Sequence, residues 1–383
     1  MSDIEFSGVT KTYPGGTTAV HDLSLRIESG SFTVFVGPSG GGKTTAMRMI
    51  NRMIAPTSGT ITIAAQDIST INPVKLRLGI GYVIQNGGLL PHRTVLDNVA
   101  TVPVLRGASR RAARSAALEL LDRVGLDRAL AQRYPAQLSG GQQQRVGVAR
   151  ALAADPPILL MDEPFSAVDP VVRAELQTEM QRLQAELHKT IVFVTHDIDE
   201  AIKLGDRVAV FGPDGHLQQY DEPQRVLSQP ATDFVAGFVG RDRGYRELSF
   251  RSASAVPLHE LAVITPEQVA GLRLDKGEWR LVVDPDRRPL GWIDTTGLEG
   301  VRAGRALADS MAAGGSLYPP DGDLRQALDA AISSPAEIGV AVEHSGAVRG
   351  GILATDVLEQ LTRQRAAEDA ERNRAFFEEE AAK

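Results

Sequence analysis

The sequence contains no cysteine, which excludes disulfide bonds, thiolate metal sites, iron–sulfur clusters and cysteine nucleophiles. It also lacks long apolar runs. None approaches the roughly 18–20 residues that a transmembrane helix needs, and Ile158–Met161 and Ile191–Val194 are only strand-sized. No signal peptide is recognisable, because the first residues include Asp3, Glu5 and Lys11 and no apolar block. We therefore expect a soluble, intracellular protein.

Positive charge is scarce as well. Lys and Arg total 41 against 48 Asp and Glu, and the net charge of −7 argues against a nucleic-acid partner. Residues 1–240 carry 23 basic and 24 acidic side chains, or −1, whereas residues 241–383 carry 18 and 24, or −6. A chain of 383 residues has room for two or three domains. The polar stretch Gly240–Arg246 is the expected boundary.

Strand-like and helix-like stretches alternate before this boundary. The strand-like stretches are short and apolar: Phe32–Val36, Ile80–Ile84, Ile158–Met161, Ile191–Val194 and Val208–Phe211. The helix-like stretches are Lys43–Arg52, Arg110–Val124, Gly141–Ala153 and Val171–Leu187. Such alternation predicts an α/β domain over residues 1–240 with a largely parallel sheet.

A different, repeated pattern follows the boundary. Two short apolar strands are each followed by a turn and a glycine-containing strand, and the helix-like stretch Leu324–Ser333 precedes the second pair. The pairs are Leu281–Val283 with Gly291–Ile293 and Val340–Val342 with Gly350–Ile352. Since 350 − 291 = 59, we predict a smaller α/β module over 248–361, a tandem repeat of about sixty residues. Residues 362–383 are charged and Ala-rich, which predicts a solvated C-terminal helix or tail.

A phosphate-binding motif lies directly after the first strand-like stretch. Gly37–Thr44 fits G-x-x-x-x-G-K-[ST] and opens the next helix-like stretch. Its glycines let backbone N–H groups turn toward phosphate oxygens, and the helix N-terminus adds partial positive charge. Lys43 can reach the β- and γ-phosphates, and the Thr44 hydroxyl can ligate Mg²⁺. A Gly-rich surface turn is the alternative, and the strand–loop–helix context argues against it.

Two adjacent carboxylates end a second apolar strand. The run Ile158–Met161 is followed by Asp162 and Glu163, whose side chains take different directions because side chains alternate along a strand. Alone, this pattern is most simply a structural strand end. Beside a phosphate loop it predicts that Asp162 holds Mg²⁺, through water, and that Glu163 polarises the attacking water as general base.

A second glycine-bearing turn, Leu138–Gln142 (LSGGQ), precedes a helix-like stretch and suits an anion. One nucleotide does not need two such cradles, whereas a sandwich of two copies does. With LSGGQ between the phosphate loop and Asp162-Glu163, residues 3–240 resemble the ATPase subunits of ABC transporters. The resemblance implies a P-loop NTPase fold. It also implies that two ATP molecules are bound between two copies of the chain, and that hydrolysis lets the two copies separate.

The resemblance also implies roles for single residues. Tyr13 would stack on adenine, and Gln85, at the end of a strand-like stretch, would sense Mg²⁺ and water and couple to membrane subunits. Asp169 ends Ser166–Asp169, where Val replaces the family's usual Leu, and would contact the partner copy. His196 would contact the γ-phosphate.

The implied site divides into three sets. Catalysis would depend on Glu163, His196 and Gln85, and Mg²⁺ would be bound by Thr44, Gln85 and Asp162. ATP would be bound by Tyr13, Gly37, Ser39, Gly40, Gly41, Gly42, Lys43, Thr44, Thr45, Ser139, Gly140, Gly141, Gln142 and Asp169. Gly41 is a departure, because family members more often carry a small side chain at that position.

The stretch Gly81–His92 is similar to ATPases of importers for glycine betaine, choline, carnitine and related osmoprotectants. This implies a peripheral subunit at the cytoplasmic face of the cell membrane. Its partners would be transmembrane permease subunits, a second copy of itself and, indirectly, a substrate-binding protein. An importer for methionine, polyamines or another small cation or amino acid is an alternative, and so is a non-transport ABC regulator.

Those importer ATPases commonly carry two CBS modules after the ATPase, and residues 248–361 resemble such a pair. Gly351–Asp356 is similar to the segment that binds adenosyl ribose, with Asp356 at the aspartate position but Leu353 at the threonine position. In the first copy the corresponding residues are Asp294 and Gly297. Two options remain: a packing or dimerisation pair, or a sensor of a regulatory nucleotide or of ionic strength. The charge of −6 favours the option of a salt sensor, because repulsion between like charges is screened as salt rises.

Overall fold

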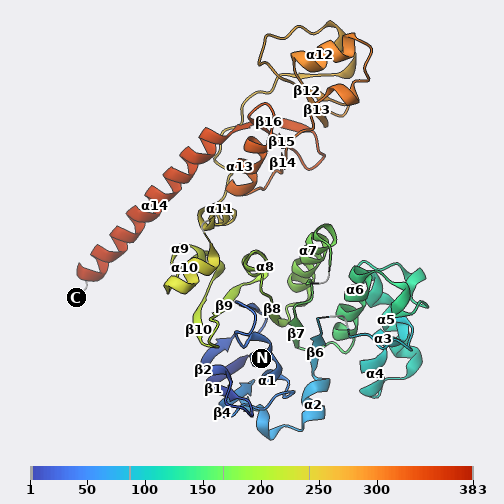
Figure 1. Cartoon of the computed structure of the whole chain (residues 1–383), viewed down its shortest axis with the longest axis vertical. Coiled ribbons are helices and arrows are strands. Elements are labelled where there is room, and N and C mark those ends of the chain that lie inside the picture. Colours follow the sequence, from blue (N-terminus) through green and yellow to red (C-terminus); the bar gives the residue numbers. More distant parts are fainter. Residues whose placement is uncertain (1–2, 86–87, 167, 241, 382–383) are drawn as a thin grey trace. The chain divides into compact units, whose positions relative to one another are not determined.

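The computed structural model describes residues 3–85, 88–166, 168–240 and 242–381. The chain forms two compact units, Met1–Arg241 and Asp242–Lys383 (Figure 1). The division falls beside residue 240, where the composition changes. Asn86 and Gly87 of the Gly81–His92 stretch, Ala167 of Ser166–Asp169, and Arg241 of the boundary stretch lie outside the described residues.

A six-stranded sheet forms the centre of the first unit. Its strand order is β10-β9-β3-β8-β7-β6, and all neighbours are parallel except β9 and β10. The strands are β3 (Phe32–Val36), β6 (Ile80–Val83), β7 (Ile158–Asp162), β8 (Thr190–Val194), β9 (Arg207–Phe211) and β10 (Leu217–Asp221). Every residue of β3, β7 and β8 is buried, as expected for parallel strands covered on both faces. The predicted parallel sheet is confirmed.

A second sheet of the first unit was not predicted. It is antiparallel, in the order β2-β1-β4-β5. The strands are β1 (Ile4–Thr12), β2 (Thr18–Ile27), β4 (Ser58–Ile63) and β5 (Gln66–Asp67). Buried and exposed residues alternate along much of β1 and β2, and their pairing is interrupted by register shifts. Continuous apolar runs, on which the prediction relied, are therefore absent here.

Helices surround the sheets of the first unit. The four predicted helices are present as α1 (Lys43–Ile50), α5 (Arg110–Arg123), α6 (Gly140–Leu152) and α7 (Pro170–Leu187). The others are α2 (Pro73–Leu78), α3 (Val95–Val99), α4 (Thr101–Leu105), α8 (Ile198–Leu204), α9 (Pro223–Ser228) and α10 (Asp233–Val239). No helix in the described ranges has both the length and the apolar character needed to cross a membrane.

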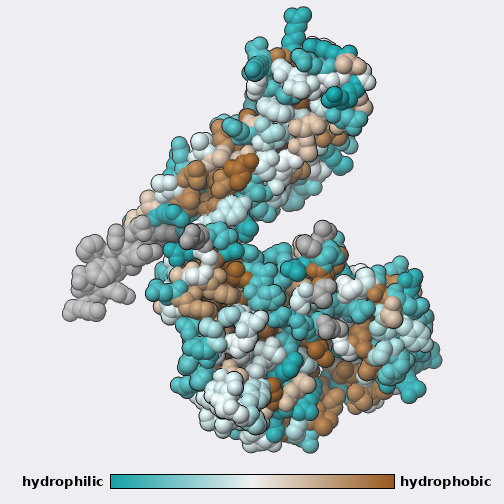
Figure 2. Space-filling model, viewed as in Figure 1, coloured by the Kyte–Doolittle hydropathy of each residue, from teal (hydrophilic) through white to brown (hydrophobic). Residues whose placement is uncertain are grey.

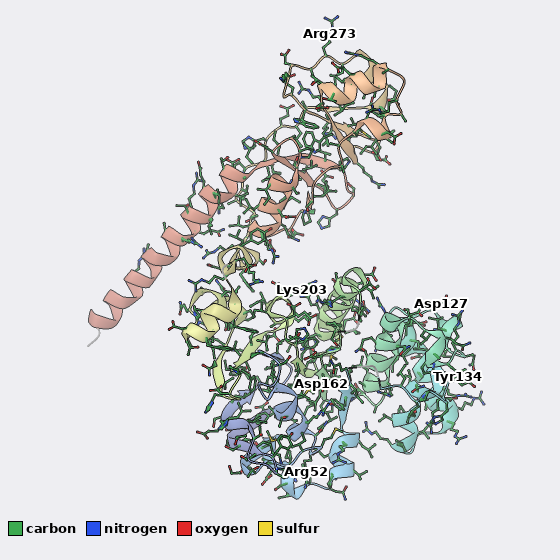
Figure 3. All side chains as sticks on the ribbon, in the orientation of Figure 1. Arg52, Asp127, Tyr134, Asp162, Lys203 and Arg273 are labelled. Atoms are coloured by element: carbon green, nitrogen blue, oxygen red, sulfur yellow. The ribbon has the colours of Figure 1, made fainter. Side chains whose placement is uncertain are left out.

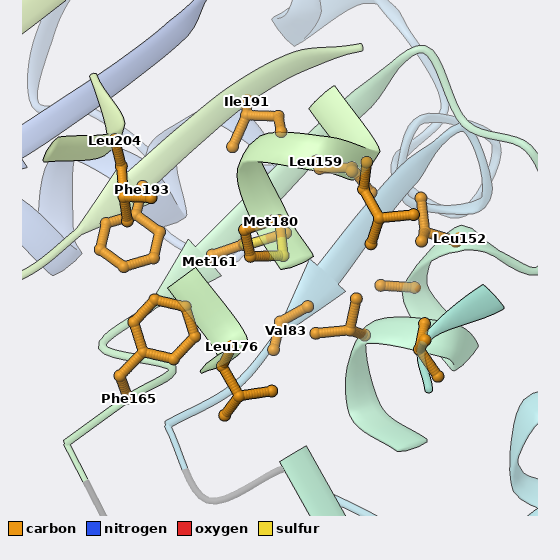
Figure 4. Packing of buried hydrophobic residues seen from close by; sticks show 14 of the residues in the cluster. Val83, Leu152, Leu159, Met161, Phe165, Leu176, Met180, Ile191, Phe193 and Leu204 are labelled. Carbon is orange, nitrogen blue, oxygen red and sulfur yellow. The ribbon is translucent and has the colours of Figure 1, made fainter. Parts of the chain in front are cut away.

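The core beneath α7 holds the ends of β7 and β8 in place (Figure 4). Met161 of β7 and Phe193 of β8 pack against Leu176 and Met180 of α7. Phe165, just after β7, places its ring 5.4 Å from that of Phe193. Because dense packing leaves little freedom, the residues that follow these strands have defined positions.

The second unit contains two three-stranded sheets of the same pattern. In each, the first two strands are parallel and the last two antiparallel. The strands are β11 (Val263–Ile264), β12 (Arg280–Val283) and β13 (Pro289–Ile293) in one sheet, and β14 (Leu317–Tyr318), β15 (Ile338–Val342) and β16 (Val348–Leu353) in the other. Apolar residues of both sheets, such as Trp292 and Val340, share one core cluster.

The helices of the second unit are α11 (Arg243–Glu247), α12 (Thr295–Arg302), α13 (Leu324–Ser333) and α14 (Ala354–Ala381). The predicted C-terminal helix is thus the continuation of a longer one, except for its last two residues, which are not described. Hydrophobic surface gathers over α13 and the start of α14, where Ile332 and Leu358 are exposed (Figure 2).

Candidate active site

The phosphate loop connects β3 to α1 through backbone conformations that favour glycine. Gly42 precedes α1 with φ of +82°, and a Cβ there would lie 2.0 Å from the carbonyl oxygen of Ala19. At Gly37, with φ of +148°, a Cβ would lie 2.2 Å from the carbonyl oxygen of Phe211. Only glycine meets both requirements, because any side chain would displace neighbouring backbone.

Gly41, where family members more often carry a small side chain, is closely surrounded by backbone atoms. A Cβ there would lie 2.7 Å from the carbonyl oxygen of Gly212, and the Gly41 amide donates to the carbonyl of Pro38 at 3.2 Å. A small side chain at this position would require the loop or its neighbour to shift. The glycine therefore suits the close approach of the Gly212 backbone.

Lys43 is the buried cation of the loop. Its Nζ donates to the carbonyl oxygens of Gly37 at 2.8 Å and Pro38 at 2.7 Å. Burial lowers the pKa of Lys43, and the nearby carboxylates of Glu163 and Asp162 oppose that shift. Phosphate oxygens can replace the two carbonyls, because an ammonium group donates in several directions.

Asp162 ends β7 and lies in the interior of the first unit (Figure 3). Its Oδ1 accepts a hydrogen bond from the Thr44 hydroxyl at 2.8 Å. Its Oδ2 accepts one from Arg48 Nη2 at 3.2 Å, and the Tyr82 hydroxyl lies 3.5 Å away. Burial raises the pKa of Tyr82, so its hydroxyl stays protonated and can donate.

Oxygen donors at this point suit Mg²⁺. Thr44 offers a hydroxyl, Asp162 a carboxylate and Gln85 a side-chain carbonyl, all hard oxygen ligands. Within the described ranges, no cluster of three or more His, Asp or Glu side chains could hold a metal alone. Such a sparse set fits Mg²⁺, which commonly keeps waters and shares its coordination with substrate phosphates.

The predicted catalytic residues Gln85 and His196 both lie beside the Glu163 carboxylate. Its Oε2 lies 3.3 Å from Gln85 Nε2 and 3.2 Å from His196 Nδ1, so residues from the ends of three parallel strands converge. Its backbone has φ of +44°, a strained value for glutamate, and its amide donates to the carbonyl of Val194 at 2.9 Å. Strain of this kind is typical of functional positions, where surrounding structure enforces it.

Tyr13 lies at the same loop. Its hydroxyl is 3.3 Å from the Thr45 hydroxyl, and Lys11 Nζ lies 5.3 Å from the ring centroid. The side chain is partly exposed, so a face of the ring is accessible for stacking. The structure therefore brings Tyr13, the phosphate loop, Asp162, Glu163, Gln85 and His196 into one connected group.

The second glycine turn is not part of that group. Ser139 and Gln142 bond to each other's backbone amides at 3.3 and 3.0 Å, forming a capping box at the start of α6. A Cβ at Gly141 would lie 2.7 Å from Val172 of α7, so the turn packs against the segment that begins α7. Asp169 accepts from the Val172 amide at 3.1 Å. Among the described residues, the hydrogen bonds of Ser139 and Gln142 stay within this turn and do not reach Glu163.

Comparisons with known proteins agree with this geometry. A family model described as ABC transporter matches residues 20–166. The choline transport ATP-binding protein OpuBA of Bacillus subtilis is 44% identical over 298 residues, which cover 76% of this chain and 78% of that protein. The chain belongs to the ATP-binding protein family of ABC transporters.

Two further relatives match only part of this ABC chain. It is 54% identical to the carnitine transport ATP-binding protein OpuCA of Listeria monocytogenes over 240 residues, which are 63% of this chain and only 60% of that relative. A solved dimer of the ATP-binding cassette MJ0796 bound to ADP and Pi is 37% identical, with a TM-score of 0.54 over 57% of this chain and 98% of that one. The P-loop NTPase fold of the ABC ATPases is thereby confirmed.

Several contacts of this ABC chain were missed by sequence analysis. Arg48 and Tyr82 hold the second oxygen of Asp162, and Thr195 and Glu200 flank His196. Arg48 stands four residues after Thr44 on α1, a spacing that places both on one helix face and could have suggested it. The other three carry no pattern that separates them from ordinary residues of a strand or helix.

Proposed function

We propose that the chain is the ATP-hydrolysing subunit of an importer for a quaternary amine of the glycine betaine, choline or carnitine type, acting with separate membrane subunits. The observation that carries the proposal is the convergence of Gln85 and His196 on Glu163, beside the phosphate loop. The cargo class rests on the names of relatives that are 44–54% identical.

The proposed reaction is attack of water on the γ-phosphorus of ATP. Glu163 accepts the proton of the water, Gln85 and His196 orient the carboxylate and contact the γ-phosphate, and the bond to the β–γ bridging oxygen breaks. Lys43 and the loop amides stabilise charge on the phosphates. Bound Mg²⁺ would neutralise the β- and γ-oxygens, and Thr44, Asp162 and Gln85 would hold it.

A second copy of the chain would complete each site. Ser139–Gln142 form a helix N-terminus suited to phosphate, yet within the described part of the chain their hydrogen bonds do not reach their own phosphate loop. In the proposed dimer this turn and Asp169 close over the ATP of the partner copy. The relative MJ0796, a bacterial ABC transporter cassette, is dimeric in its own solved structure.

Membrane subunits would dock at the helical part of the first unit. A cavity of about 470 Å³ is lined by residues of α3, α4 and α5 together with Tyr134. Its apolar lining includes Leu105 and Tyr134, both exposed, while Asp97 and Arg114 form an ion pair at 2.8 Å. The lining residues His92, Arg93 and Thr94 lie seven to nine positions after Gln85 in the sequence, so a partner docked here is close along the chain to the glutamine. The proposed location is peripheral, at the cytoplasmic face of the membrane.

The second unit is proposed to regulate transport. The Asp356 carboxylate, at the ribose-binding position of CBS modules, lies 2.6 Å from His259 Nε2 and is therefore already engaged. A separate cavity of about 320 Å³ is lined by residues that include Arg287, Arg349 and Glu260. Because Arg287 and Arg349 both line this cavity, it is, rather than Asp356, the candidate site for an anionic regulatory ligand such as a nucleotide.

The cargo is tested by ATP hydrolysis of the complex assembled with its permease and binding protein. The proposal expects stimulation by glycine betaine, choline or carnitine, and not by methionine or polyamines. Stimulation by the latter compounds alone would assign a different cargo. Failure of the chain to fractionate with membranes when the permease is present would instead favour the non-transport regulator.

A further inference from the structure

His196 is held through the residues on either side of it. Thr195 is buried, and its amide donates to the carbonyl of Phe35 at 3.0 Å. The Thr195 hydroxyl accepts from the Asp197 amide at 3.1 Å and donates to Glu200 Oε2 at 2.6 Å. One hydroxyl thus bridges the backbone across His196 and ties it to α8. The His196 side chain is 56% exposed, so its direction depends on this backbone together with its contact with Glu163.

Glu200 is a carboxylate in an unusual place, with 6% of its surface exposed. Burial raises its pKa, and the Thr195 hydrogen bond opposes that shift. The Gln177 amide lies 3.4 Å from Oε1, and Lys203 in turn donates to Gln177 Oε1 at 3.0 Å. A buried carboxylate is costly unless its partners are fixed, so this network has a defined geometry.

Arg173 connects the same network to the start of α7. Its amide donates to the carbonyl of Asp169 at 2.9 Å, and Nη2 donates to the carbonyl of Val168 at 3.4 Å. Its Nη1 lies 3.9 Å from Asp197 Oδ2, and its Nε lies 3.9 Å from Glu200 Oε1. The Nε is buried and has no hydrogen-bond partner among the described residues. The guanidinium therefore lies just beyond hydrogen-bond distance of two carboxylates, Asp197 and Glu200, that follow His196 in the chain.

We propose that Thr195 and Glu200 are positioning residues for His196, and that Arg173 couples them to the segment Val168-Asp169. The inference rests on the proposed function, in which His196 contacts the γ-phosphate and Asp169 meets a second copy. Engagement of Asp169 by that copy draws Arg173 onto Glu200 and satisfies its unpaired Nε. The same movement fixes the Thr195–Asp197 bridge, so His196 is aligned when the partner is in place.

The bridge is tested by Thr195→Val against Thr195→Ser, because only serine keeps the hydroxyl. Thr195→Val should lower kcat for ATP about tenfold or more, since small misplacements of a reacting group are costly. The KM for ATP should stay within about twofold, because binding does not depend on the bridge. Thr195→Ser should keep most of kcat. Hydrogen exchange of the amides at 195–200 should accelerate in Thr195→Val only.

The coupling is tested by Arg173→Met and Glu200→Gln, alone and combined. Each should lower kcat, and the double variant should be no slower than the worse single one, because both changes break one interaction. Arg182→Met is the matched control on the same helix, since Arg182 pairs with Glu179 and Glu186 and contacts none of these residues. It should leave kcat unchanged. If Thr195→Val does not fold, Glu200→Gln still tests the interaction between Thr195 and Glu200, because it alters the other partner of the same hydrogen bond.

Distinct outcomes separate this inference from the proposed function. If the wild-type chain does not hydrolyse ATP, the proposed function fails, while faster exchange at 195–200 in Thr195→Val would still support the bridge. Equal kcat and equal exchange in Thr195→Val, Thr195→Ser and wild type would overturn the positioning role. Additive losses in Arg173→Met and Glu200→Gln would overturn the coupling.

Discussion

Three polar residues in or beside the candidate site are buried: Lys43, Asp162 and Glu200 each have at most 6% of their surface exposed. Isolated burial of such groups is destabilising, so each has specific partners. Lys43 bonds to two loop carbonyls, Asp162 to Thr44 and Arg48, and Glu200 to Thr195. These partners offset the cost of burial and hold the polar groups in defined positions.

The burial of Glu200 should make the free energy of unfolding depend on pH. Because burial raises its folded-state pKa above the ordinary 4.5, its contribution to stability is fully present below that value. The contribution is lost as pH rises through the folded-state pKa. Urea unfolding from about pH 4 to 8 should therefore show wild type losing free energy of unfolding relative to Glu200→Gln.

Glu119→Gln, on the exposed face of α5, controls for the loss of one negative charge. A gap between wild type and Glu200→Gln that does not change with pH would contradict the role of burial at Glu200.

At the scale of elements, the phosphate loop is fixed by steric contacts as well as by hydrogen bonds. Gly40 and Gly42 have nearly the same positive φ, +85° and +82°. A Cβ at Gly40 would meet nothing within 4 Å, whereas one at Gly42 would lie 2.0 Å from the Ala19 carbonyl oxygen. At Gly40 only the backbone conformation requires glycine, whereas at Gly42 both the conformation and the close approach of Ala19 require it.

Gly40→Ala and Gly42→Ala should therefore differ. Gly40→Ala adds only the strain of a left-handed alanine, about 1–2 kcal/mol of unfolding free energy. Gly42→Ala adds displacement of the β2 backbone and should cost more, with a larger loss of ATP affinity. Urea unfolding and ATP titration measure both. Equal effects of the two substitutions would show that packing against Ala19 is unimportant.

Sequence patterns predicted the elements that are buried on both faces. Phe32–Val36 and Ile191–Val194 are continuous apolar runs, and both are central strands. The strands β1 and β2 escaped prediction because one face of each is polar and their pairing contains bulges.

The same contrast holds for the site. The order of motifs placed Lys43, Glu163 and His196 in one group, and the structure brings them together. Thr195 and Glu200 were not found, because their importance depends on a contact between β8 and α8 that no local pattern encodes.

In the molecule as a whole, nearly all of the net negative charge lies in the second part of the chain. Residues 241–383 carry −6 against −1 for residues 1–240. The polar contacts of the candidate site all lie within the first unit. This separation favours a division of labour in which the first unit hydrolyses ATP and the second modulates it.

Removal of residues 242–383 should therefore spare basal ATP hydrolysis, within about twofold, while abolishing its response to salt in the assembled transporter. The physical reason is that like-charge repulsion in the second unit is screened as ionic strength rises, with a Debye length of about 10 Å at 0.1 M. Transport and hydrolysis measured across a salt series provide the test. An unchanged salt response in the truncated protein would exclude this role for the second unit.

The role of Glu163 as general base is tested by Glu163→Gln, with ATP turnover and sedimentation velocity measured on the same sample. Glutamine keeps the shape of Glu163 but cannot accept a proton from water. We expect this variant to bind ATP, to form an ATP-dependent dimer and to hydrolyse ATP at least about a hundredfold more slowly than wild type. Near-normal steady-state hydrolysis by Glu163→Gln would contradict the assignment.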